Sequence, residues 1–78
     1  MILSVIKMKL QRIRDLREDS DLTQTEIGKI LGLPQRTYAY YENGGRAIPL
    51  EILISLADFY NVSVDYILGR TNNRNMNK

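Results

Sequence analysis

The segment spanning residues 22–44 constrains the fold more than any other part of the chain. Thr23, followed three residues later by Glu26, is a capping box, so a helix begins directly after Thr23. Gly32 ends that helix because glycine accepts a positive φ, and Pro34 presets φ for the first turn of the next helix. The sequence therefore predicts two short helices joined by a sharp turn, with the second helix presented outward at a fixed angle.

Apolar residues recur at helical spacing along most of the chain, and the alternation typical of strands is absent from the sequence. Pro49 opens one further helix, which is apolar nearly all round and is therefore expected to be buried on more than one side. Ser63 caps a last short helix that Gly69 ends. These patterns predict a compact all-α bundle of five helices. The expected helices cover residues 8–19, 24–31, 35–42, 50–60 and 64–68.

The two ends of the chain differ in character from its helical part. Residues 1–7 are an N-terminal extension whose apolar side chains cover a core or a dimer surface, unless Met8 is the natural start of the protein. Residues 70–78 hold four Asn and have no apolar pattern, so we expect a disordered polar tail. The helical domain itself is expected over residues 8–69.

Composition argues against several classes of function. The sequence has no cysteine and no histidine, so the commonest metal ligands and the commonest general base are missing. It also lacks paired carboxylates on an apolar helix face and a glycine loop able to cradle a phosphate, so we expect neither an enzyme nor a bound cofactor or metal. No apolar run reaches the roughly 20 residues that span a bilayer, and no signal peptide is recognisable. We therefore expect a cytoplasmic protein without a membrane partner.

The distribution of charge says more than the net charge, which is only +2. Residues 1–46 carry eight basic and six acidic side chains, whereas residues 47–69 carry three acidic side chains and no basic one. Because phosphate groups attract basic surfaces, residues 47–69 are the part of the chain least suited to face a nucleic acid.

The second helix of the opening pair carries the residues that point to a partner. Helical spacing places Tyr38 and Tyr41 in the core and Gln35, Arg36 and Tyr40 on the opposite face. Gln and Arg side chains can form paired hydrogen bonds with adenine and guanine edges in the DNA major groove. Taken alone, however, such side chains on an exposed helix are more simply explained as solvated.

At many positions together, the sequence resembles the helix-turn-helix of the Cro and phage-repressor type, the XRE-like family of bacterial and phage regulators. The resemblance covers residues 10–69, nearly the whole helical part. The matching positions are Gln24, Ile27-Gly28, Leu31-Gly32-Leu33, Tyr38, Tyr41, Glu42-Asn43-Gly44, Pro49, Leu56-Ala57 and the run from Asn61 to Gly69. The resemblance implies a lambda-repressor-like DNA-binding domain. It further implies a transcriptional repressor that binds a palindromic double-stranded DNA operator as a homodimer, with residues 35–42 in the major groove. No small-molecule effector is evident from the sequence.

The resemblance also implies roles for individual side chains. Gln35, Arg36 and Tyr40 would face base edges. Arg17 would form a structural ion pair with Glu42. Contacts with DNA phosphates would come from Gln24, Thr37, Asn43, Gly44, Arg46 and Arg17, with a thymine methyl as the alternative partner of Thr37.

Alternatives stay open for several of these positions. Tyr40 is bulky for a residue that reads bases, and it fits equally along the sugar-phosphate backbone. Gln24 is also explained as an ordinary first-turn residue, and Arg46 as a solvated loop charge. Pro34 stands where a small polar cap is common in the family. Residues 66–68 form either a dimer surface or part of the core.

The rival hypothesis for the whole chain is a protein-interaction module, such as an antitoxin-like or phage-control partner, that keeps the helix-turn-helix mainly as a scaffold. An exposed apolar patch around the last helix or residues 1–7 would favour this alternative.

Overall fold

The computed structural model describes residues 10–75, and within that range it contains five α-helices and no strand. The helices are α1 (Gln11–Asp19), α2 (Gln24–Leu31), α3 (Gln35–Asn43), α4 (Leu50–Tyr60) and α5 (Val64–Ile67). The predicted all-α class and the five helices are therefore confirmed. None of the described helices is long and apolar enough to cross a membrane. The expected N-terminal extension and Met8 lie outside the described residues.

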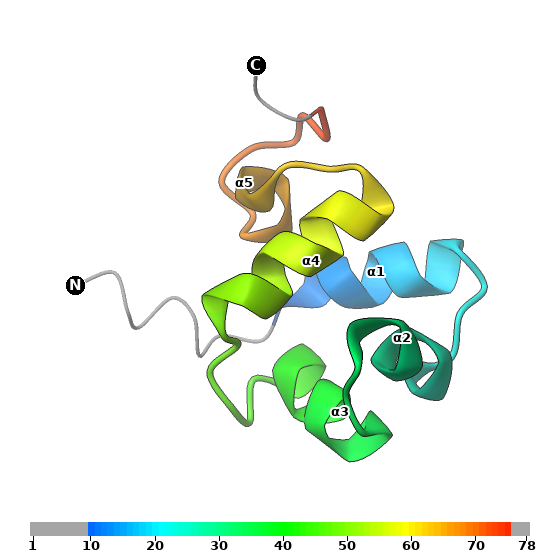
Figure 1. The fold of residues 1–78 in the computed structure, drawn as a ribbon. Helices are drawn as coiled ribbons and strands as arrows, with labels where there is room; N and C mark the ends of the chain where they lie inside the picture. Colours follow the sequence, from blue (N-terminus) through cyan, green and yellow to red (C-terminus); the bar gives the residue numbers. More distant parts are fainter. Residues whose placement is uncertain (1–9, 76–78) are drawn as a thin grey trace.

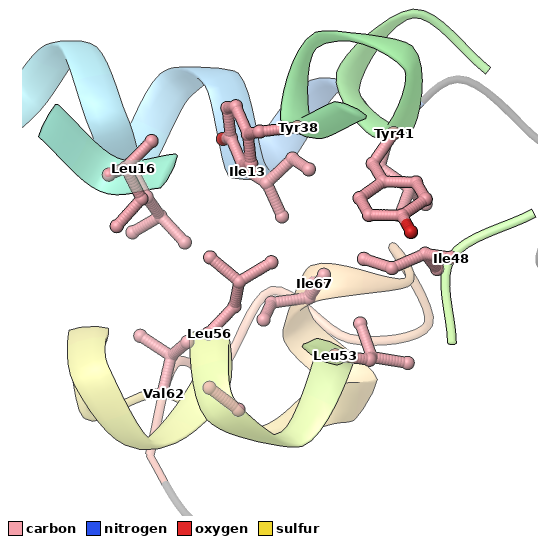
Figure 2. Close-up of a cluster of buried hydrophobic side chains, with 12 residues drawn as sticks. Ile13, Leu16, Tyr38, Tyr41, Ile48, Leu53, Leu56, Val62 and Ile67 are labelled. Carbon is pink, nitrogen blue, oxygen red and sulfur yellow. The ribbon is translucent and has the colours of Figure 1, made fainter. Parts of the chain in front are cut away.

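One hydrophobic core holds the helices together, and it lies between α1 with α3 on one side and α4 with α5 on the other (Figure 2). Tyr38 is fully buried and Tyr41 is 7% exposed, as the helical spacing predicted. Full burial of a large apolar side chain contributes about 1.5–3 kcal/mol to folding, so this shared core fixes how α3 is presented. The other buried apolar residues are Leu10, Ile13, Leu16, Ile27, Ile48, Leu53, Leu56, Ala57, Val62 and Ile67.

The turn between α2 and α3 needs glycine at two positions. Gly32 adopts a left-handed conformation with φ of 74° and ends α2. The N–H of Leu33 donates to the carbonyl oxygen of Gly28 at 2.7 Å. A Cβ atom on Gly28 would lie only 2.9 Å from the carbonyl oxygen of Leu33. Gly28 is therefore required chiefly by the backbone of the turn, whereas the start of α3 lies at an ordinary distance of 3.7 Å from such a Cβ.

The exposure of α4 differs from the expectation that it is buried on more than one side. Leu53 and Leu56 are buried, but Leu50 is 62% exposed and Ile54 and Phe59 are each 45% exposed. The reason is geometric, because within residues 10–75 the rest of the domain packs on a single side of α4 (Figure 1). The exposed polar residues of α4 are Glu51, Ser55 and Asp58. The apolar side chains on either side of them are therefore also in contact with solvent.

Residues 70–75, for which composition predicts a disordered polar tail, lie against α1 and α5. The N–H of Ser63 donates to the carbonyl oxygen of Arg74 at 2.9 Å. The Arg12 guanidinium donates to the carbonyl oxygen of Thr71, and it lies 4.2 Å from the centroid of the Tyr66 ring. The Arg74 guanidinium lies 5.3 Å from the same ring. These contacts join residues that are distant in the sequence, and composition alone cannot predict such contacts.

The same contacts bear on the dimer surface expected at residues 66–68. Ile67 is 2% exposed and belongs to the core, and Leu68 packs against that core. Tyr66 is partly buried beside Arg12 and Arg74. Within the described part of the chain these residues close the core, which was the second of the two alternatives.

Candidate nucleic-acid interface

The first turn of α3 presents two polar side chains to solvent. Gln35 and Arg36 are both exposed, whereas Tyr38 and Tyr41 on the other face of the helix are buried. Pro34 precedes the helix with φ of −61° and supplies no side-chain cap. The amide N–H groups at this end of the helix therefore have no side-chain acceptor from the capping position, and the helix dipole makes such an end favourable for an anion.

A hydrogen-bond chain links this turn to the start of α2. Gln35 Nε2 donates to Gln24 Oε1 at 2.7 Å, and Gln24 Nε2 donates to Glu42 Oε1 at 3.2 Å. Each side-chain amide has two N–H donors, so each glutamine keeps one donor beyond the bond described here. Gln24, expected as a phosphate contact, is therefore also the residue that orients Gln35.

Glu42 is the buried centre of this chain of contacts. Its side chain is 3% exposed and accepts hydrogen bonds from Arg17 Nε at 2.7 Å and from the Tyr38 hydroxyl at 2.6 Å. Burial alone would raise the pKa of Glu42, but the hydrogen bonds from Arg17, Tyr38 and Gln24 outweigh it. The pKa therefore lies below its ordinary value, and the carboxylate is charged at neutral pH.

Arg17 ties α1 to α3 through Glu42. Its side chain is 12% exposed, and its remaining nitrogens donate to the carbonyl oxygen of Leu22 at 2.9 Å and to Glu42 Oε1 at 3.4 Å. The hydrogen bond to Glu42 is the main reason why the pKa of Arg17 is raised. Three of the five guanidinium N–H donors of Arg17 are therefore used inside the protein. The expected ion pair with Glu42 is present, and the phosphate contact of Arg17 stays a prediction.

The loop after α3 forms a second cluster of candidate residues. Gly44 is left-handed with φ of 80° and ends the helix, and the N–H of Gly45 donates to the carbonyl oxygen of Tyr40 at 2.9 Å. The Arg46 guanidinium carbon lies 4.9 Å from the centroid of the Tyr40 ring. Asn43 and Arg46 are exposed, so the polar surface continues from the end of α3 into this loop.

Thr37 lies on α3, whereas the acidic residues of the C-terminal half lie on α4 and α5. Thr37 is half-buried on α3, next to the exposed first turn. Glu51, Asp58 and Asp65 are exposed on α4 and α5. Figure 1 shows α3 at one end of the domain and α5 at the other. α5, which carries Asp65, is therefore remote from α3, whereas α4, which carries Glu51 in its first turn, begins shortly after the loop that follows α3.

Sequence reasoning missed the contacts that join candidate residues to one another. The bonds from Gln35 to Gln24 and from Tyr38 to Glu42, and the stacking of Arg46 on Tyr40, were not expected. Only the Tyr38–Glu42 pair has a sequence signal, because residues four apart on a helix are neighbours.

Comparisons with known proteins agree with this geometry. The model of the helix-turn-helix family HTH_3 matches residues 13–67. The chain is 42% identical over 64 residues to the uncharacterized HTH-type transcriptional regulator YobD of Bacillus subtilis, covering 82% of this chain and 57% of that protein. It is 42% identical over 53 residues to the cryptic phage CTXphi transcriptional repressor RstR of Vibrio cholerae, covering 68% of this chain and 48% of that protein. It is 34% identical over 59 residues to the antitoxin PezA of Streptococcus pneumoniae, covering 76% of this chain and 37% of that protein.

The chain belongs to the helix-turn-helix family of the Cro and phage-repressor, XRE-like type. This membership confirms the predicted lambda-repressor-like fold and places the chain in a non-enzymatic family, as expected. The chain spans about half the length of the curated relatives it matches. No solved structure shows a significant match to it.

Proposed function

We propose that the chain binds double-stranded DNA in a sequence-specific manner and regulates transcription through α3 in the major groove. The observation that supports this most strongly is the exposed first turn of α3, whose Gln35 is held by Gln24 and whose helix is anchored by Glu42. In this proposal Arg36 pairs with a guanine edge and Gln35 with an adenine edge. A side chain oriented before binding loses less conformational freedom when the complex forms.

Phosphate contacts would surround these base contacts. Gln24 lies at the N-terminus of α2 and keeps a free N–H donor, and Arg46 carries an exposed charge beyond the end of α3. Asn43, Gly44 and Thr37 would add polar contacts on either side of the recognition helix. Such contacts fix the register on the duplex without reading its sequence.

Recognition by a homodimer on a palindromic operator is part of the same proposal. α3 has nine residues and is therefore about 13 Å long, so a single copy reaches only a few base pairs. Two copies on half-sites about one helical turn apart, roughly 34 Å, would supply the missing specificity. Repression rather than activation is supported by RstR, which is named a transcriptional repressor. A cytoplasmic location follows in this proposal because the DNA targets of bacterial and phage regulators lie there.

A protein-interaction role is the second candidate, and two observations favour it. One relative, PezA, is named an antitoxin. The exposed apolar side chains of α4 are a surface that a partner protein would bury. They are Leu50, Ile54 and Phe59. They lie on α4, whereas the sequence placed the expected patch around the last helix or at residues 1–7, and residues 1–7 lie outside the described part of the chain.

Selection of bound DNA from a random double-stranded pool tests the proposal, followed by titration of the selected sequence at two salt concentrations. We expect a shared palindromic motif and binding that weakens steeply with salt, because phosphate contacts release counterions. Arg36→Ala is then compared with Arg70→Ala, a control that removes the same charge from an exposed arginine beyond α5. A selection that enriches no motif contradicts sequence-specific binding.

A further inference from the structure

The last turn of α3 and the loop after it form one unit around the Tyr40 ring. The carbonyl oxygen of Tyr40 accepts the N–H of Gly45 at 2.9 Å, which folds the loop back along the helix. A Cβ atom on Gly45 would lie only 3.2 Å from Tyr40 Cδ1, so the ring rests against the Gly45 backbone. The Arg46 guanidinium carbon lies 4.9 Å from the ring centroid. We call this arrangement the Tyr40–Arg46 stack.

The position of Tyr40 along α3 bears on what its ring can reach. It lies four residues after Arg36, on the same face but about 6 Å further along the axis. Recognition helices of this motif contact base edges with their N-terminal residues. A ring in the last turn that already packs on Gly45 and Arg46 is therefore directed toward the loop rather than toward the bases that Gln35 and Arg36 would contact.

The charge of Arg46 is available for an anion. Arg46 is exposed and forms no ion pair with any residue between 10 and 75, whereas Arg14 and Arg17 both do. A guanidinium lying over an aromatic face keeps its edge donors free while the ring limits its rotamers.

We propose that Tyr40 is a positioning residue, whose ring holds the Arg46 guanidinium in place for a DNA phosphate instead of reading a base edge. This inference rests on the proposed DNA-binding function and deepens it. It assigns Tyr40 and Arg46 a joint role in affinity, and it leaves base selection to Gln35 and Arg36. It also differs from the expectation that Tyr40 itself contacts bases.

The stack is tested first in the free protein by NMR spectroscopy. We expect the side-chain resonances of Arg46 to be shifted upfield by the Tyr40 ring in the wild-type chain and in Tyr40→Phe, and to lose that shift in Tyr40→Leu. Tyr40→Phe keeps the aromatic face, and Tyr40→Leu keeps only apolar bulk, so the two variants are matched. Arg46 resonances that are the same in the wild-type chain and in Tyr40→Leu would overturn the proposal without any reference to DNA.

Binding to the DNA selected by the wild-type chain tests the role. An exposed cation–π contact corresponds to a two- to fivefold change in affinity, roughly, so we expect Tyr40→Leu to weaken binding by about that factor. Arg46→Ala should reduce the slope of log affinity against log salt by about 0.9, the value for one phosphate contact, and Tyr40→Leu should reduce it by a part of that amount. Tyr40→Phe and Arg70→Ala should leave the slope nearly unchanged.

Two further measurements separate positioning from base reading. The double variant Tyr40→Leu with Arg46→Ala should bind no more weakly than Arg46→Ala alone, because Tyr40 acts through Arg46. Repeating the selection with Tyr40→Leu should return the wild-type motif. A changed base preference at one position with an unchanged salt slope would overturn the proposal and make Tyr40 a base contact. If the wild-type chain enriches no motif, the proposed function fails, while the NMR comparison still decides whether the stack exists.

Discussion

Arg17 and Glu42 are joined across α1 and α3 by a hydrogen bond of 2.7 Å between Arg17 Nε and Glu42 Oε2, in a part of the domain where their side chains are only 12% and 3% exposed. The same carboxylate accepts the Tyr38 hydroxyl and the Gln24 amide. Residues from α1, α2 and α3 therefore meet at one charge. The orientation of the recognition helix depends on this contact as well as on apolar packing.

Removing Arg17 should destabilise the domain strongly. Arg17→Ala leaves the Glu42 carboxylate buried without its main partner, and breaking a buried pair in this way costs about 3–5 kcal/mol of the free energy of unfolding. The matched control is Arg14→Ala, because Arg14 pairs with Glu18 on the same helix while both side chains are 51% exposed. Such a surface pair contributes about 0–1 kcal/mol. Urea unfolding followed by circular dichroism measures both, and equal losses would contradict a special role for Arg17.

The dependence of stability on pH should report the charge of Glu42. Its pKa is lowered in the folded state, so its contribution is fully present above the ordinary glutamate value of 4.5 and is lost as pH falls through the folded pKa. Glu42→Gln resembles the protonated side chain at every pH. We therefore expect the difference in unfolding free energy between the wild-type chain and Glu42→Gln to be large at pH 7 and to shrink on acidification below pH 4.5. A difference that stays constant down to about pH 2, roughly 2.5 units below that value, would argue against this linkage.

Removing the hydroxyl of Tyr38 and removing that of Tyr60 should affect stability differently. The Tyr38 hydroxyl donates to Glu42 Oε2 at 2.6 Å, so Tyr38→Phe should cost about 1.5–3 kcal/mol, the range for hydrogen bonds to charged groups. The Tyr60 hydroxyl is buried and has no hydrogen-bond partner among residues 10–75. Tyr60→Phe should therefore leave the free energy of unfolding unchanged or increase it.

Alkaline titration of tyrosine absorbance gives a second measurement for the same pair of variants. Burial is the main reason why the pKa of Tyr60 is raised to about 12 and why the pKa of Tyr38 is raised as well. Because both folded pKa values exceed the ordinary value of 10.0, the associated stability is present below pH 10 and is lost above it. The titration step that is present in the wild-type chain and absent from Tyr60→Phe belongs to Tyr60. If that step lies near pH 10, the Tyr60 hydroxyl is not buried.

The turn and helix ends could be predicted because their signals are local. The Thr23 hydroxyl accepts the Glu26 N–H at 3.1 Å, and Glu26 Oε1 accepts the Thr23 N–H at 2.8 Å, as the capping box predicts. Gly32 adopts the positive φ that its position suggested. Residue types and spacings alone determine such features, since every partner lies within a few residues.

Contacts between side chains on different helices could not be predicted in the same way. The bond from Gln35 to Gln24 depends on how α2 and α3 cross, and it spans 11 residues. The Tyr40–Arg46 stack depends on a loop whose path follows from Gly44. Residues 70–75 are the extreme case, because Arg12 meets Thr71 across 59 positions. A composition rule that treats the tail by itself cannot include a partner that far away.

Amide hydrogen exchange should show whether residues 70–75 stay on the domain. The Ser63 N–H is bonded to the carbonyl oxygen of Arg74, whereas the neighbouring Val62 N–H is bonded to Ala57 at the end of α4. In a chain that ends at Gly69 we expect Ser63 to lose protection while Val62 keeps it. If Ser63 exchanges rapidly in the full chain as well, the tail is disordered, as its composition predicts.

Replacing Arg36 should change which DNA sequence is preferred. We expect Arg36→Ala to weaken binding to the selected operator by about 1–3 kcal/mol and to relax the preference at one base pair per half-site, because a bidentate contact to a guanine edge is lost. Arg70→Ala removes the same charge from a side chain paired with Asp65 of α5, and α5 lies at the other end of the domain from α3 (Figure 1), so the motif should stay unchanged. Selection from a random pool with each variant measures the motif, and titration measures affinity. Equal weakening on all sequences would make Arg36 a phosphate contact, and base reading would then fall to Gln35 alone.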